Sequence, residues 1–115
     1  MIKLLNKKIL NDLEQNKYAF DDIIPNDAPV IVKYFNPVYF GSWFVLEGQK
    51  IFDDWEFFGV EELDNKIRFT EFSLSFLENM QLPYGHSIKI DENYKGTHGD
   101  LKKMVESYGD NYQLF

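Results

Sequence analysis

The chain contains no cysteine. This absence excludes disulfide bonds, thiolate metal centres and cysteine nucleophiles, and it argues against a small secreted scaffold held by disulfides. No apolar run approaches the ~20 residues needed to span a bilayer. The N-terminal segment reaches Asn6, Lys7 and Lys8 before any run long enough for a signal peptide. We therefore expect a cytoplasmic protein that makes no membrane contact.

Signatures of catalysis and of phosphate binding are also missing. The chain has no Gly-x-Ser-x-Gly nucleophile elbow, and no glycine is followed by a Gly-Lys-Ser/Thr phosphate cradle. His86 and Ser87 are adjacent, so on a strand they would point to opposite faces and could not act as nucleophile and base. Acid pairs such as Glu61-Glu62 do not by themselves place two carboxylates across a cleft. The sequence predicts no catalytic residue.

Residues 91–100 are the segment of the chain that most resembles a metal-binding loop. It matches a calcium-binding loop at three positions, but Lys95 and Lys102 stand where oxygen ligands are required. His98 and Asp100 could ligate a transition metal, yet such a site needs three or four ligands. We predict a polar loop, with no metal and no cofactor.

Aromatic and apolar residues are abundant, at 17% and 44% of the chain. A disordered segment lacks the apolar surface that offsets ordering entropy, so this composition predicts a folded protein. A chain of 115 residues falls in the range of one domain that buries roughly two-thirds of its surface. We predict a single domain over residues 1–115.

The order of elements predicts an α+β fold: an antiparallel sheet of about five strands, with an N-terminal helix and two short helices packed on it. Turns are expected at Gly48-Gln49, Asp53-Asp54 and Asp64-Asn65, and an antiparallel meander is the simplest topology. Most aromatics of the middle segment are expected on one core side of the sheet, with the acids on its wet face. The predicted strands cover residues 30–35, 42–47, 55–60, 67–70 and 86–90.

Three helices are predicted from caps and periodicity. The first runs from about residue 7 to 15 behind Asn6 as N-cap. The second, at 75–78, begins with a Ser75–Glu78 capping box. The third runs from about 101 to 108, with Asp100 as its cap and Gly109 as its stop.

Negative charge is concentrated in the middle of the chain. Residues 1–20 carry four lysines and two acids, a net +2; residues 21–65 carry ten acids and two lysines, a net −8; the remainder carries seven acids and six bases, a net −1. Such a distribution repels nucleic-acid phosphate and membrane surfaces, and it attracts basic partners. The same charge is also typical of a solvated surface that keeps a protein soluble.

Several short motifs, taken in order, resemble the bacterial family known as domain of unknown function 2958. They are Ser42-Trp43-Phe44, Phe57-Phe58-Gly59, Phe72-Ser73-Leu74-Ser75 and Leu82-Pro83, within residues 3–90. The resemblance implies a setting on plasmids, integrative elements or phages, with no assigned reaction. Two positions depart from the family pattern: Phe76 replaces an acid, and Gly85-His86-Ser87 replaces a charged Glu-Arg-Asp run.

We therefore carry three hypotheses of function. The first is a protein-interaction module, of the kind that inhibits a host defence protein, presenting an acidic face to a basic partner. The second is a structural or accessory homo-oligomeric protein, such as a homodimer, in which Tyr108, Tyr112 and Phe115 cover a neighbouring subunit or the protein's own sheet. The third and least favoured is an enzyme with a small site around Tyr84, His86 and His98. The predicted partner-binding acids are Asp53, Asp54, Glu56, Glu61, Glu62 and Asp64.

Overall fold

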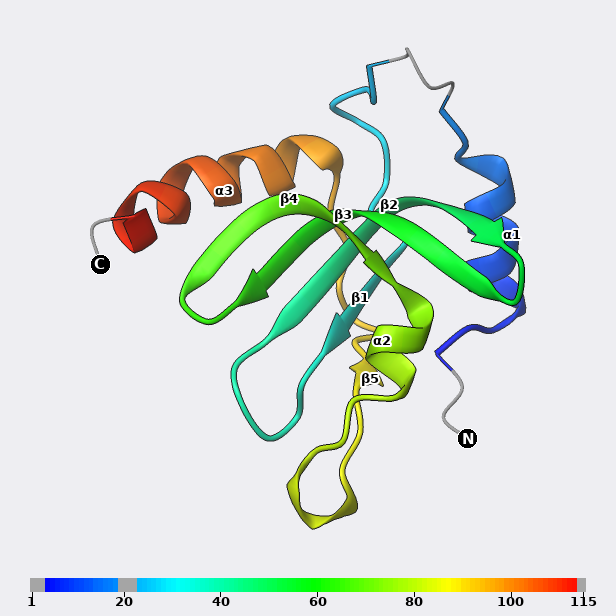
Figure 1. Cartoon of the computed structure of the whole chain (residues 1–115). Helices are drawn as coiled ribbons and strands as arrows, with labels where there is room; N and C mark the ends of the chain where they lie inside the picture. Colours follow the sequence, from blue (N-terminus) through cyan, green and yellow to red (C-terminus); the bar gives the residue numbers. More distant parts are fainter. Residues whose placement is uncertain (1–3, 19–22, 114–115) are drawn as a thin grey trace.

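The computed structural model describes residues 4–18 and 23–113, with side chains up to residue 108. It holds three α-helices, one 3-10 turn and five strands (Figure 1). The elements are α1 (Lys7–Gln15), β1 (Val32–Phe35), β2 (Ser42–Ile51), β3 (Asp54–Leu63), β4 (Lys66–Ser73), α2 (Leu74–Glu78), η1 (Pro83–Gly85), β5 (Lys89–Ile90) and α3 (His98–Gln113). The predicted α+β class is confirmed.

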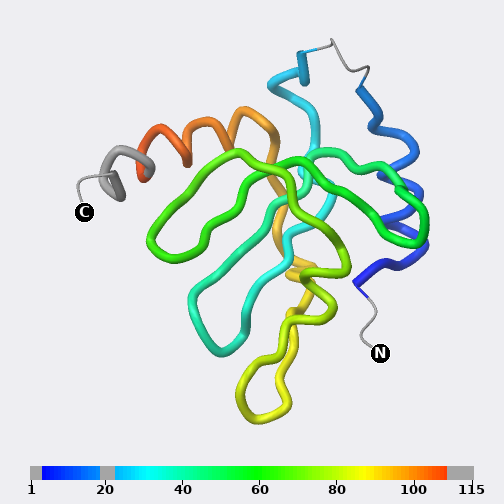
Figure 2. Tube along the Cα trace, viewed as in Figure 1, coloured from blue at the N-terminus to red at the C-terminus, as the bar shows by residue number. Residues whose placement is uncertain are grey.

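The strands form one antiparallel sheet in the order β4-β3-β2-β1-β5. The first four strands make the predicted meander, which can be followed along the trace in Figure 2. The fifth strand pairs with β1, since Phe35 lies opposite both Ser42 and Lys89. The predicted turn at Gly48-Gln49 is wrong, because both residues lie inside β2.

The core lies on both faces of the sheet, not on the single side that we expected. Side chains alternate along a strand, so the neighbours Trp43 and Phe44 face opposite ways. Trp43 and Phe57 pack with α1 and α2, whereas Phe44 and Phe69 pack with α3. Figure 1 shows α1 and α3 on different sides of the sheet. We call these sides the α1 face and the α3 face.

A bulge in β2 changes which residues reach each face. Val45 pairs with Gly59, but the next pair is Glu47 with Phe58, so Leu46 is an extra residue. Directly opposed residues share a face. Glu47 therefore lies on the α3 face beside Phe58. Without the bulge, it would lie opposite Phe57 on the α1 face.

Gly48 follows the bulge and lies under α1. A Cβ atom there would come within 2.7 Å of the Phe57 ring and 3.1 Å of a Leu13 methyl group. Leu13 is fully buried and brings α1 onto this point of the sheet. Gly48 therefore allows α1 to approach the sheet closely. Its role is this close contact, not a chain reversal.

The helix caps differ in part from those predicted. Asn6 caps α1 as expected, since its Oδ1 accepts from the Ile9 N–H. In α2 the cap is Ser73, whose hydroxyl accepts from the Phe76 N–H, and not Ser75. Among the described residues, no helix has the length and apolar character needed to cross a membrane.

The C-terminal helix is longer than predicted. It begins with a reciprocal cap between Thr97 and Asp100, in which the Thr97 N–H donates to the carboxylate and the Asp100 N–H donates to the threonine hydroxyl. Gly109 does not stop it, because α3 continues to Gln113. Leu101 is its fully buried anchor on the α3 face.

Candidate functional site

The six acids that the sequence singled out do not share one face. Asp53 lies in the β2–β3 turn and Asp64 in the β3–β4 turn, at opposite ends of β3. Glu56 and Glu62 lie on the α3 face, because each is an even number of residues from Phe58. Glu61 lies on the α1 face. An acidic surface built from all six is therefore not continuous.

Asp54 holds the start of α2. One carboxylate oxygen accepts from the backbone N–H groups of Trp55 at 2.8 Å and Ser75 at 3.0 Å, and the other accepts from the Ser75 hydroxyl at 2.6 Å. The Ser75 hydroxyl, more than the backbone donors, lowers the pKa of Asp54 below its ordinary value of 3.8. Because the Ser73 hydroxyl accepts from the Phe76 N–H in the same first turn, α2 has two caps, one of them supplied by Asp54 of β3.

We expect Asp54→Ala to destabilise the fold by about 1–2 kcal/mol, the usual effect of losing a helix cap with charge-assisted bonds. The folded pKa is lowered, so the stabilisation is complete above the unfolded value of about 3.9 and is lost as the pH falls through the folded pKa. Urea unfolding at pH 7 and at acid pH measures this. Asp53→Ala removes the same charge one residue away and should change little at either pH; equal effects would contradict the capping role.

Glu61 is also engaged within the molecule. Its carboxylate accepts from the Trp43 indole N–H at 3.0 Å and from the Arg68 guanidinium at 3.3 Å, and its side chain is only 13% exposed. Glu62 lies near Lys33 on the other face; burial raises the pKa of Glu62, while the lysine charge lowers it. Glu61 is therefore held by contacts within the molecule, whereas Glu62 is a partly buried carboxyl beside Lys33.

A different set of acids converges on the α3 face, where α3 leaves the sheet uncovered. Glu47, Phe58 and Glu71 form one row across β2, β3 and β4, since Phe58 lies opposite both glutamates. Glu56 lies in the next row, between Gln49 and Ser73. We call the surface around Glu47, Glu56 and Glu71 the acidic groove. Phe58, stacked on Phe69 with ring centroids 6.1 Å apart, forms its apolar floor.

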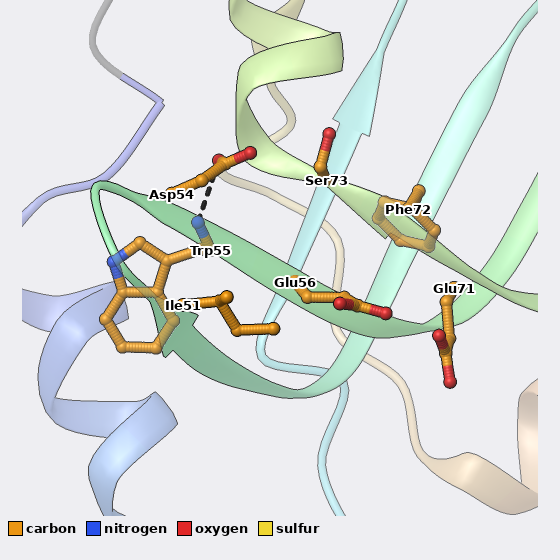
Figure 3. Close-up of a pocket in the computed structure, with 7 residues that line it drawn as sticks. All are labelled: Ile51, Asp54, Trp55, Glu56, Glu71, Phe72 and Ser73. Atoms are coloured by element: carbon orange, nitrogen blue, oxygen red, sulfur yellow. Dashed lines mark hydrogen bonds between the residues drawn. The ribbon is translucent and has the colours of Figure 1, made fainter.

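Two adjoining pockets meet at this groove and share Glu56 and Glu71. The first has a volume of about 370 Å³ and the second about 510 Å³. Figure 3 shows Glu56 extending along the first pocket toward Glu71, whereas Trp55 lies at the opposite end of the group of labelled residues. The remaining lining residues are Ile51, Asp54, Phe72 and Ser73 in the first pocket, and Lys17, Tyr18, Ile24, Glu47, Gly48, Gln49, Phe57 and Phe58 in the second.

The groove carboxylates favour an added positive charge. The pKa of Glu56 is raised, first by its hydrogen bond with the Glu71 carboxyl and then by the charge of that group. Burial raises the pKa of Glu47, and a hydrogen bond from the Tyr18 backbone N–H lowers it. Within the described residues, no Lys or Arg forms an ion pair with Glu47, Glu56 or Glu71. A cation bound here would relieve the repulsion between them.

Sequence reasoning missed Glu47 and Glu71 for identifiable reasons. The predicted fourth strand stopped at Thr70, so Glu71 was taken outside the sheet, whereas β4 continues to Ser73. Glu47 stood last in its predicted strand, and only the bulge brings it to the α3 face. A longer alternation, from Ile67 through Phe69 to Glu71, was the available signal for Glu71.

The residues considered for catalysis or metal binding are not brought together. His98 packs near the start of β1, where its backbone N–H donates to the Ala28 carbonyl, and its ring Nδ1 lies 3.0 Å from the Ile24 carbonyl. Tyr84 and His86 are exposed and precede β5, beside the other end of β1. Among the described residues, no three His, Asp or Glu side chains form a cluster that could hold a metal ion.

The fold and the groove define a small α+β protein with a five-stranded antiparallel sheet and a cluster of glutamates on its α3 face. The chain belongs to the family of proteins of unknown function DUF2958, whose model matches residues 4–107. No curated protein and no solved structure matches the chain.

Proposed function

We propose that this protein is a cytoplasmic protein-interaction module of a phage or mobile element, which binds a basic segment of a partner protein in the acidic groove. Three glutamates from three strands line two adjoining pockets, and this arrangement supports the proposal. Within the described residues no Lys or Arg forms an ion pair with them, and Lys17, which lines the second pocket, pairs with Glu14 instead. A defence protein that binds nucleic acid is the kind of partner we favour, because such proteins expose Lys and Arg to phosphate.

The groove also offers apolar contacts for the stem of a long basic side chain. Ile51 lines the first pocket on the α3 face, and Trp55 borders the same pocket from the α1 face, where it stacks on Phe57. Phe52 stands at the tip of the β2–β3 turn with 93% of its surface exposed. Lys and Arg bury their methylene stems on such surfaces and keep the charged head beside carboxylates. A partner segment that mixes basic and apolar residues fits this arrangement.

The test is capture of a basic partner by the tagged protein at low and high salt, with variants. We expect the triple variant Glu47→Gln, Glu56→Gln and Glu71→Gln to weaken capture about tenfold or more, because it removes the charges that attract and hold the partner. Raising salt should weaken capture by the wild type, since exposed charges are screened. Lowering the pH through the raised pKa of Glu56 should weaken it as well.

A matched control removes the same charge elsewhere. Asp64, Glu92 and Glu106 are exposed and lie outside both pockets. The variant Asp64→Asn, Glu92→Gln and Glu106→Gln should retain most of the capture. Equal losses in the two triple variants would show that net charge acts without the groove, and no loss in either would contradict the proposal.

A further inference from the structure

We propose that a second surface of this protein binds a second copy of the same chain. It consists of the β1–β2 turn, residues 36–41, and the α2–β5 connection, residues 79–88, which we call the loop end. Phe35 lies opposite both Ser42 and Lys89, so both segments leave the sheet at the same end. Figures 1 and 2 show them projecting from that end.

The loop end carries exposed aromatic side chains that contribute little to the fold. Tyr39, Phe40 and Tyr84 are 64%, 62% and 92% exposed. At ~200 Å² per aromatic residue, they leave roughly 400 Å² open to solvent. Phe76 extends this surface, because its ring stands edge-on against Trp43, which in turn lies under Gly41.

The aromatic groups are presented on an ordered backbone. The Asn36 side chain accepts from the N–H groups of Val38 and Tyr39, both at 2.9 Å, and the Asn36 N–H donates to the Gly41 carbonyl. Tyr84 has a φ of 60°, a left-handed conformation that is unfavourable for any residue with a Cβ atom. A bulky residue held in this way without burial is typical of a position kept for an interaction.

Charge identifies the second copy as the occupant. Asp, Glu, Lys and Arg make up 27% of the chain, so the 16 residues of the loop end would hold about four; they hold none. Elsewhere two copies of net charge −7 repel each other. At the loop end, two copies can meet without placing carboxylates in contact. The acidic groove does not extend to this end of the sheet.

The area fits a weak, symmetric dimer. Stable interfaces bury about 800 Å² per partner, and weak ones less than about 600 Å². The aromatic side chains supply roughly half of the larger figure, with the polar atoms of the same loops around them. The acidic groove lies toward the far end of β2 and β3: Glu47 is about 17 Å along β2 from Ser42 at the loop end, and Glu56, opposite Gln49, is about 23 Å from it, at ~3.3 Å per residue. Two grooves would therefore remain open in the dimer.

The proposal is tested by sedimentation of the wild type over a wide concentration range at two salt concentrations. We expect a monomer–dimer equilibrium that strengthens as salt rises, because screening weakens the repulsion between acidic copies. Binding of a basic partner has the opposite salt dependence, so failure of one proposal does not imply failure of the other. A wild type that stays monomeric at high protein concentration and high salt overturns the proposed self-association. The loop end would then be a contact surface for a different protein.

Variants locate the interface. Tyr39→Ser, Phe40→Ser and Tyr84→Ser together should weaken dimerisation at least tenfold and leave capture of a basic partner unchanged. Phe52→Ser is the matched control, since Phe52 is as exposed and also has a positive φ, but lies next to Asp53 near the groove. It should leave the dimer intact. A dimer that survives the triple variant, or one that is broken by Tyr108→Ser on α3, overturns the assignment.

Because any variant could alter folding, dilution of the isotope-labelled wild type provides a second measurement. Amide resonances of residues 36–41 and 79–88 should shift with protein concentration, while those of β2–β4 around Glu56 should not. Concentration-dependent shifts confined to the groove or to α3 would contradict the proposal.

Discussion

Gly59→Ala is expected to destabilise the protein by about 3 kcal/mol or more, enough to unfold a marginal domain. A Cβ atom on Gly59 would lie 1.7 Å from the Phe44 carbonyl oxygen and 3.2 Å from the Leu46 nitrogen. Both are backbone atoms at the bulge, so no side chain can move to make room. The strands β2 and β3 would have to separate at the bulge.

Thermal and urea unfolding measure this effect, with Gly85→Ala as control. Gly85 has a φ of 73° but no atom within 4 Å of the added methyl group. Its replacement should cost only about 1 kcal/mol, from the backbone conformation alone. Similar losses at the two glycines would show that the close approach at the bulge is not the cause.

Trp43→Ala is expected to cost about 3–5 kcal/mol, the range for removing a large buried aromatic side chain. Trp43 is fully buried and packs in the core on the α1 face. Its indole N–H also donates to Glu61, so the variant leaves one carboxylate oxygen without this partner. The Trp43→Phe variant separates the two contributions, because it keeps an aromatic ring and loses only the donor and the second ring.

A double-mutant cycle of Trp43→Phe with Glu61→Met isolates the hydrogen bond, because methionine has no side-chain oxygen that could accept from the indole N–H. We expect a coupling energy of about 1–2 kcal/mol between the two positions, since the acceptor is charged and poorly exposed. Glu61→Gln should lower stability without weakening capture of a basic partner. A change in capture with unchanged stability would instead indicate that Glu61 is part of the partner-binding surface.

Local signals predicted the parts of the fold that depend on neighbouring residues. The Asn6 cap and the Asp64-Asn65 turn depend on short-range chemistry, and the φ values of 54° and 62° in that turn suit Asp and Asn. Alternation identified five strands because each carries β-branched or aromatic residues. The return of β5 to β1 was not predictable, because a two-residue strand carries no pairing information of its own.

The candidate site was less predictable than the fold, because it depends on register. One inserted residue at the bulge decides the face of Glu47, and the pairing of β3 with β4 decides that Glu71 comes near Glu56. Neither follows from spacing along the chain. Asp54 shows the converse: it stands among exposed acids in the sequence, but an α2 residue distant in the chain gives it a structural role.

The acidic groove is tested most directly by the affinity of a defined basic probe, a fluorescent nonaarginine peptide, for the wild type and the two charge-matched triple variants. The wild type and the variant changed at Asp64, Glu92 and Glu106 should bind the peptide with similar affinity at low salt. The Glu47, Glu56 and Glu71 variant should bind about tenfold more weakly or worse. Equal affinity of the two variants would contradict the groove as the binding site.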